Sequence, residues 1–212
     1  MVMNVDVFDM RLGEVAPRHT SLAGFNVLSV NMRTRMHVLV SDIHSMASRR
    51  KEHLGILRIT AHGFVDYMQL CKEGLTPFTA YSEFQVLKEV FQRQGLIVLV
   101  GCNVVDRTTR RSLLMKYFAE ACNVHVLGSS ALEYYQHSQA SPINFGKWEG
   151  NLYVCSPDGN MTLVSTPVQR STRPETDLLP ALPLTFKGWI KRVGANFHPY
   201  VAMRVWIVIQ PK

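Results

Sequence analysis

Between about residue 24 and residue 135, short apolar runs that suit β-strands alternate with longer runs whose apolar residues recur at helical spacing. This alternation is typical of a mostly parallel sheet with helices on both faces, because each parallel strand needs a crossover to return to the same edge. The sequence therefore predicts an α/β fold. The expected strands cover residues 25–30, 54–60, 96–100 and 124–127. The run 96–100, LIVLV, is apolar throughout, which is typical of a strand covered on both faces.

Three amphipathic runs are the expected crossover helices. The first starts near Asn31, a suitable N-cap, and stops by Gly55; its predicted face is Met36, Leu39, Val40, Ile43 and Ala47. The second is predicted over residues 82–93, after a turn at Thr76-Pro77 and closed by Gly95, with inward residues Phe84, Leu87 and Phe91. The third has one predicted face made of Leu113, Leu114, Tyr117, Phe118 and Ala121.

The pattern changes towards the C-terminus. Two alternating runs between residues 146 and 164 meet at Pro157-Asp158-Gly159, which predicts a β-hairpin appended to the core. Residues 1–165 are therefore expected to form one domain with its core at 24–135. Residues 166–184 hold four prolines and are predicted to be a linker or surface arm. Residues 185–212 are basic and aromatic, and are expected to pack on the core or a partner, or to contact a membrane surface peripherally.

Composition places the chain among globular proteins, with 47% hydrophobic and 18% charged residues in a length of 212. The net charge of +7 favours anionic partners, although a moderate excess also keeps proteins soluble. The basic clusters lack the aromatic interleaving and the motifs of nucleic-acid modules, so no nucleic-acid partner is predicted. The N-terminus does not resemble a signal peptide, and no apolar run reaches the length of a membrane-spanning helix.

Four scattered cysteines without CxxC spacing argue against a zinc site or a disulfide framework. A reducing, cytoplasmic location is the simpler expectation. Cys71, Cys122 and Cys155 are assigned to packing. His37 and His44 lie seven residues apart and could share a helix face, but two histidines without a third ligand are weak evidence for a metal.

Two neighbouring predicted strands end in His62-Gly63 and in Gly101-Cys102. The carboxyl ends of parallel strands share one edge of the sheet, where catalytic groups collect. A thiol becomes a strong nucleophile when an imidazole can accept its proton or stabilise its thiolate. The N–H groups of Gly63 and Cys102 could then stabilise an oxyanion. His62 and Cys102 are therefore the candidate catalytic pair.

The runs Ile56-Leu57-Arg58-Ile59-Thr60-Ala61-His62-Gly63 and Leu96-Ile97-Val98-Leu99-Val100-Gly101-Cys102 resemble the strand-His-Gly and strand-Cys signatures of caspase-like cysteine peptidases. The resemblance covers about residues 24–165. It is closest to bacterial domains in which the cysteine follows a glycine and a Trp-Gly and Pro-Asp-Gly hairpin follows the sheet. Those motifs correspond here to Trp148, Gly150 and residues 157–159.

The resemblance implies an endopeptidase without metal or organic cofactor, in which Cys102 is the nucleophile, His62 the general acid/base and Gly63 an oxyanion donor. The substrate is then a protein or peptide, and the chain's own segment 166–184 is one candidate for cleavage. Ser129 and Ser130, after the next strand, are predicted to line the specificity pocket. The run Gly-Cys-Asn-Val-Val-Asp departs from the Gln-Ala-Cys-Xaa-Gly run of animal caspases, so their substrate pocket is not carried over.

The same residues also allow other roles. Asp66, Asn103 and Asp106 are candidates to orient His62 or to bind a basic substrate residue, and turn positions are the alternative. The chain could also be a non-catalytic caspase-like scaffold, or a module that binds an anion or nucleotide at the rim 101–111 with Arg107, Arg110 and Arg111. No phosphate-binding glycine motif supports that last alternative.

Overall fold

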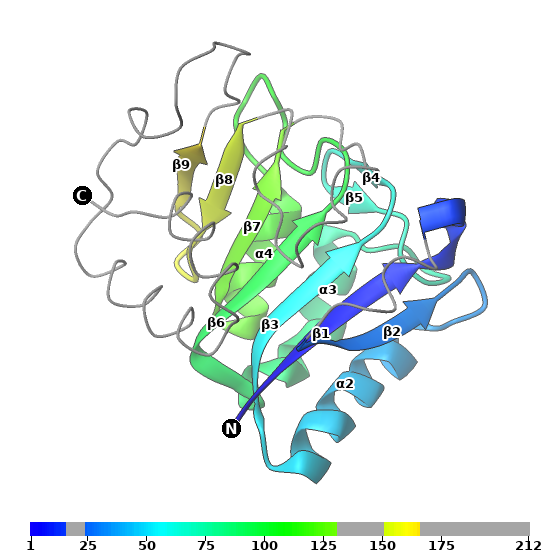
Figure 1. Ribbon diagram of the computed structural model, residues 1–212. Helices are drawn as coiled ribbons and strands as arrows, with labels where there is room; N and C mark the ends of the chain where they lie inside the picture. The colour runs from blue at the N-terminus through cyan, green and yellow to red at the C-terminus, as the bar shows by residue number, and fades with distance from the viewer. Residues whose placement is uncertain (16–23, 131–150, 166–212) are drawn as a thin grey trace, which may run out of the picture.

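The computed structural model describes residues 1–15, 24–130 and 151–165, and in this part of the chain a seven-stranded sheet carries the fold (Figure 1). The strand order is β2-β1-β3-β6-β7-β8-β9. The strands are β1 (Val2–Asp9), β2 (Asn26–Val30), β3 (His53–Thr60), β6 (Phe91–Val100), β7 (His125–Ser129), β8 (Leu152–Cys155) and β9 (Met161–Ser165). The first five in this order pair in parallel, while β8 and β9 are antiparallel to their neighbours. The predicted α/β class with a mostly parallel sheet is confirmed.

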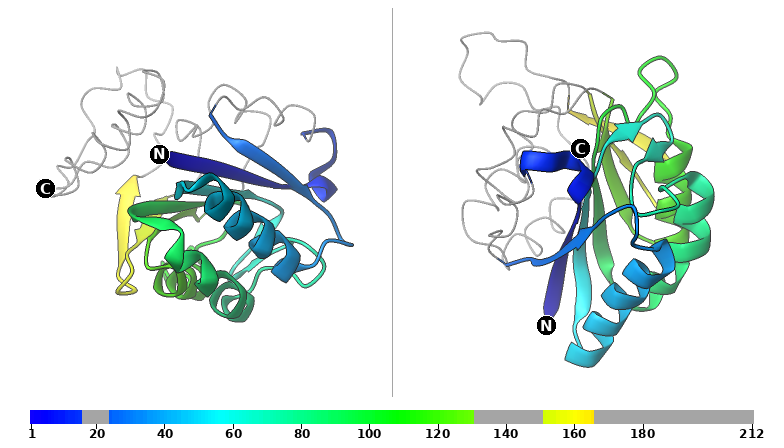
Figure 2. Two further views of the ribbon diagram at one scale, coloured as in Figure 1. Left: turned by 90° about the horizontal axis from the view of Figure 1, so that it is seen from below. Right: turned by 90° about the vertical axis from the view of Figure 1, so that its right-hand side faces the viewer.

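Three α-helices connect the parallel strands: α2 (Met36–Arg50), α3 (Pro77–Phe84) and α4 (Leu113–Cys122). The steps from β2 to β3, from β3 to β6 and from β6 to β7 all run in one direction across the sheet, so right-handed crossovers place their helices on the same face. Figure 2 shows the three helices on that face and the short 3-10 helix η1 (Met10–Val15) on the other. In the described ranges the expected arrangement of α-helices on both faces is therefore not observed.

The sheet begins earlier than expected. β1 lies between β2 and β3 and is buried along most of its length, so the buried core already includes Met3, well before residue 24. The strand 96–100 is buried as predicted, with every residue 6% exposed or less. The hairpin of β8 and β9 is also confirmed, but it continues the main sheet through β7 and is not appended to it. The predicted segments 166–184 and 185–212 lie outside the described residues.

Helix α2 buries the five residues that the sequence predicted, Met36, Leu39, Val40, Ile43 and Ala47. Its ends differ from the prediction. Asn31 is not the N-cap; a carboxylate oxygen of Glu73 accepts the Met36 N–H at 2.9 Å instead. Lys51, in a left-handed conformation, ends the helix, and Gly55 lies inside β3.

The helix predicted over 82–93 is wrong in position. Thr76 caps α3 with a reciprocal capping box and Pro77 occupies the first turn, so the expected turn is a helix start. A 3-10 helix, η2 (Gln85–Glu89), follows α3, and Phe91 already belongs to β6. In α4 the predicted face is also rotated: Leu113 and Tyr117 are 52% and 39% exposed, and the buried residues are Leu114, Met115, Phe118, Ala119, Ala121 and Cys122.

Candidate active site

The strands that precede His62 and Cys102 are direct neighbours in the sheet. β3 pairs with β6 in parallel, Thr60 stands opposite Val100, and the Ala61 N–H donates to Val100 O at 3.2 Å. His62 and Cys102 each follow two residues after this last pair. Figure 1 shows β3 and β6 pointing to the same edge of the sheet, so the predicted meeting of the two segments at one edge is confirmed.

The two segments touch through their main chains. A Cβ atom at Gly63 would lie 2.6 Å from Cys102 O and 2.8 Å from Cys102 N. A Cβ atom at Gly101 would lie 3.1 Å from Ala61 O and 3.3 Å from the Gly63 Cα. At Gly63 any side chain would collide with the main chain of residues 101 and 102, whereas at Gly101 the main-chain contacts are tight and the nearest atom is the flexible Met68 Cε at 2.9 Å. Beside this contact, the His62 side chain is exposed and Cys102 is half-buried.

A short hairpin follows His62, made of β4 (Gly63–Phe64) and β5 (Tyr67–Met68). The Gln69 N–H donates to His62 O at 2.7 Å. Arg11 holds the next residues, because its guanidinium donates to Gln69 O at 3.0 Å and to Cys71 O at 2.8 Å. Asp9 accepts from the same guanidinium at 2.6 Å and from Cys71 N at 3.2 Å. The end of β1 thus anchors the segment that carries His62, a support that the sequence analysis missed.

Asp66 lies in the turn of this hairpin with a positive φ of 57°. Its Oδ1 accepts from Leu114 N at 3.0 Å and from Ser112 Oγ at 3.2 Å. Ser112 is itself the N-cap of α4 and accepts from Met115 N. Asp66 therefore caps α4 and ties the hairpin after His62 to the helix that follows Cys102.

Replacing Asp66 with alanine should lower the free energy of unfolding by about 1–2 kcal/mol, because the Leu114 N–H loses its acceptor and alanine tolerates the left-handed backbone less well. Asp66→Asn is the matched control, since the amide keeps an acceptor oxygen and asparagine tolerates positive φ. Urea unfolding measures both variants. Equal losses for the two substitutions would contradict the capping role.

The loop 101–111 is built around Asp106. Its Oδ1 accepts from Thr108 N at 2.7 Å and from Thr109 N at 2.8 Å. The hydrogen bond from Thr109, followed by that from Thr108, lowers the pKa of the Asp106 carboxyl. The Arg110 N–H then donates to Asp106 O at 2.9 Å. Asp106 is thus a turn residue in the structure. Asn103 is half-buried with a left-handed φ of 50°.

Ser129 and Ser130, at the end of β7, lie behind this loop. Val105 N donates to Ser129 O at 2.9 Å, and Arg107 Nε donates to Ser130 O at 2.6 Å. Both serines are buried, at 0% and 5% exposure, and Ser130 Oγ accepts from Asn151 N at 3.1 Å. They support the loop from inside the fold. Their predicted contact with a substrate stays a prediction.

The four cysteines differ in their access to solvent. Cys71, Cys122 and Cys155 are buried, whereas Cys102 is half-buried. Burial raises the pKa of Cys71 to about 12 and that of Cys155 to about 11, and it raises the pKa of Cys122 as well. Desolvation therefore keeps the three buried thiols protonated and unreactive at neutral pH, which agrees with their assignment to packing.

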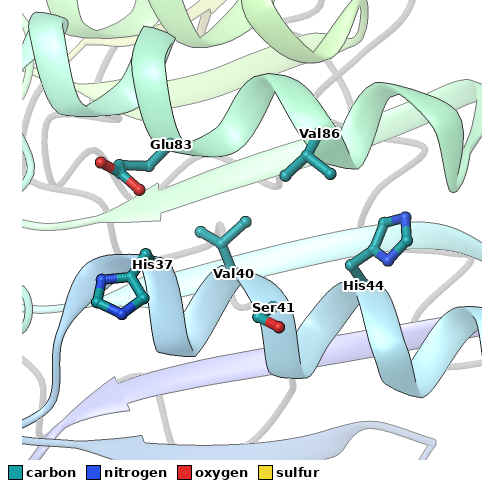
Figure 3. A pocket seen from close by; sticks show the side chains of 6 residues that line it. All are labelled: His37, Val40, Ser41, His44, Glu83 and Val86. Carbon is teal, nitrogen blue, oxygen red and sulfur yellow. The ribbon is translucent and has the colours of Figure 1, made fainter.

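His37 and His44 lie on the outer side of the helical layer. They line a shallow groove of about 190 Å³ between α2 and the α3–η2 segment, shown in Figure 3, together with Val40, Ser41, Glu83 and Val86. Within the residues that the structure describes, no group of three or more His, Cys, Asp or Glu side chains is arranged to hold a metal ion. The groove is separate from the edge of the sheet that carries His62 and Cys102.

In the described ranges, no helix has both the length and the apolar character needed to cross a membrane. Comparison of the sequence with known protein families and with curated proteins gives no match.

Proposed function

We propose that this protein is a cysteine endopeptidase of caspase-like type that cleaves protein or peptide substrates through His62 and Cys102. The observation that carries the proposal is the main-chain contact of Gly63 with Gly101 and Cys102, at the ends of two adjacent parallel strands. This contact leaves an exposed imidazole and a half-buried thiol on neighbouring strand ends. A nucleophile beside a general base is the minimum that acyl transfer requires.

In the proposed reaction, His62 accepts the proton of the Cys102 thiol, and the thiolate attacks the carbonyl carbon of the scissile peptide bond. The C–N bond breaks as His62 returns the proton to the leaving amine. The acyl group remains on Cys102 as a thioester. Water then attacks the thioester with its proton passing to His62, which releases the acid and restores the thiol.

The hairpin geometry supports Gly63 as an oxyanion donor. Met68, the partner of Gly63 in the hairpin, donates its N–H to Leu75 O at 2.9 Å and accepts from Leu75 N at 2.8 Å. Because the N–H and C=O of one strand residue point to the same side, the Gly63–Met68 pair is not hydrogen-bonded, and Gly63 directs its N–H away from Met68. That N–H is then available to a carbonyl oxygen developing negative charge near Cys102.

The alternative of an anion-binding or nucleotide-binding rim at 101–111 loses support. Anion sites at helix N-termini use backbone N–H groups that have no other acceptor. At the start of α4, Asp66 accepts from Leu114 N and Ser112 accepts from Met115 N. In the loop, Asp106 accepts from the N–H groups of Thr108 and Thr109. A carboxylate already occupies the place where a phosphate would bind.

Alkylation with a limiting amount of iodoacetamide at pH 6, followed by mass spectrometry, tests the pair. Cys102 should react first, because burial keeps the other three thiols protonated. Exposure alone would give the same order, so the decisive variant is His62→Ala. If His62 stabilises the thiolate, this variant should react about 10–100 times more slowly at Cys102. His37→Ala, an exposed histidine on α2, is the matched control.

The pH dependence of the alkylation rate separates stabilisation of the Cys102 thiolate by His62 from simple exposure of Cys102. An ordinary thiol loses about tenfold in thiolate per pH unit below a pKa of about 8.5. A thiolate paired with His62 keeps its reactivity at pH 6, and His62→Ala should restore the steep profile. A wild-type profile that is already steep and unchanged by His62→Ala would refute the dyad.

A further inference from the structure

The carboxylates at the candidate catalytic edge are already bonded within the chain. Asp9 accepts from Arg11, and Glu73 accepts from the first N–H of α2. Asp66 caps α4, and Asp106 closes its own loop. Each of these carboxylates therefore has a structural partner within the chain.

Three arginines of the same edge are not compensated in this way. Arg107, Arg110 and Arg111 are exposed on the loop after Cys102. Arg107 donates to Ser130 O, a neutral carbonyl. Within the described residues, the ion pairs involve Arg11 and Arg58 and none involves these three arginines. The loop therefore presents net positive charge to solvent.

Apolar side chains lie beside this charge. Phe64 and Val65 of the hairpin are 61% and 46% exposed, and Leu113 at the start of α4 is 52% exposed. The hydrogen bonds of Asp66 to Ser112 and Leu114 hold the hairpin against the start of α4. We call Phe64, Val65, Arg110, Arg111 and Leu113 the hairpin–helix surface. Its first residue, Phe64, directly follows Gly63, whose main chain contacts Gly101 and Cys102.

We propose, on the basis of the function proposed above, that the hairpin–helix surface binds an acidic polypeptide segment that also carries large apolar side chains. Carboxylates of this segment pair with Arg110 and Arg111, while its apolar side chains cover Phe64, Val65 and Leu113. A peptide chain that reaches Cys102 passes over or ends close to this surface. The surface thus selects substrates that are acidic near the cleaved bond.

Binding to the inactive Cys102→Ala variant tests the inference apart from catalysis. The probe is a fluorescein-labelled peptide of Glu, Leu and Ser, measured by anisotropy at low and high salt. It is compared with one peptide in which Gln replaces Glu and another in which Ser replaces Leu. The Glu-Leu peptide should bind best, both replacements should weaken binding about tenfold, and high salt should weaken it further.

Two double variants, each of which reverses two charges, test the role of the arginines, and Phe64→Ser tests the apolar part of the surface. Arg110→Glu with Arg111→Glu should weaken binding of the Glu-Leu peptide about tenfold, and Phe64→Ser should weaken it several-fold. Arg49→Glu with Arg93→Glu changes the net charge equally at two exposed positions, near the C-terminus of α2 and near the start of β6, and should leave binding within about twofold. Thermal unfolding confirms that each variant folds.

Equal losses in the two charge-reversal pairs, or no preference for Glu over Gln, would overturn the inference. So would binding of anionic phospholipid vesicles or a single-stranded oligonucleotide through Arg110 and Arg111 without binding of the Glu-Leu peptide. Peptide binding at this surface with no cleavage by the wild-type protein would retain the surface and reject the peptidase. Cleavage of a peptide library without preference for acidic residues would retain the peptidase and reject the binding surface.

Discussion

Replacement of Cys102 with alanine is expected to lower peptide cleavage by at least about a thousandfold, because no other group in the proposed site can form the acyl-enzyme. The measurement is digestion of a proteome-derived peptide library, with new termini identified by mass spectrometry. His62→Ala should lower cleavage by about 10²–10⁴-fold, because the thiol loses its base and the leaving amine its acid. The double variant should be little worse than Cys102→Ala alone, since the two residues act in one step.

Cys155→Ala is the matched control for this loss. It removes a thiol of the same chain from β8, where Cys155 is buried and its raised pKa of about 11 keeps it protonated. Cleavage should survive this change. Cleavage that persists in Cys102→Ala, or a wild-type protein that cuts nothing in the library, would refute the peptidase proposal.

Gly63→Ala is expected to be the most damaging substitution for stability at this edge. The new Cβ would lie 2.6 Å from Cys102 O, 2.8 Å from Cys102 N and 2.9 Å from Gly101 C. These are main-chain atoms of the segment that follows β6 and cannot rotate away, so residue 63 and residues 101–102 must move apart. We expect a loss of about 3 kcal/mol in the free energy of unfolding, and a fall in Tm of roughly 6–12 °C.

Gly128→Ala, at the end of β7, is the matched control. Its Cβ would lie 2.9 Å from Met115 Sδ and 3.2 Å from Val104 Cγ1, which are side-chain atoms that can shift. It should lose less than half as much stability, measured by thermal and urea unfolding. If Gly63→Ala unfolds like the wild type, the close contact between the two strand ends does not exist as described.

The local patterns of the sequence were sufficient for several elements. The buried face of α2 and the strands β2, β3, β6 and β7 follow from hydrophobic spacing. This spacing depends only on residues within a few positions of one another in the sequence. The same spacing misplaced the second helix. Phe84, Leu87 and Phe91 fit a helical face, but Phe91 pairs with Leu54 of β3, a contact across the fold that no local window contains.

The N-terminal strand was missed for a related reason. Acidic residues at positions 6 and 9 make the first ten residues look unsuited to a buried strand. In the structure Asp6 lies beside Arg58 of β3, with Nε and Oδ1 3.8 Å apart, and Asp9 binds Arg11. A buried carboxylate is tolerated when a cation faces it. One of those cations comes from more than fifty residues away in the chain.

By itself, the sequence determined that two apolar strands lead into His62-Gly63 and Gly101-Cys102, because the composition of a strand and the place where it ends depend on consecutive residues. Only the tertiary structure decided what the charged groups around them do. Asp66 was a candidate to orient His62 and instead caps α4, while Asp106 folds its own loop. The hydrogen bonds of Asp66 depend on where Ser112 and Leu114 lie, 46 and 48 residues further along the chain, and that position exists only once the sheet has assembled.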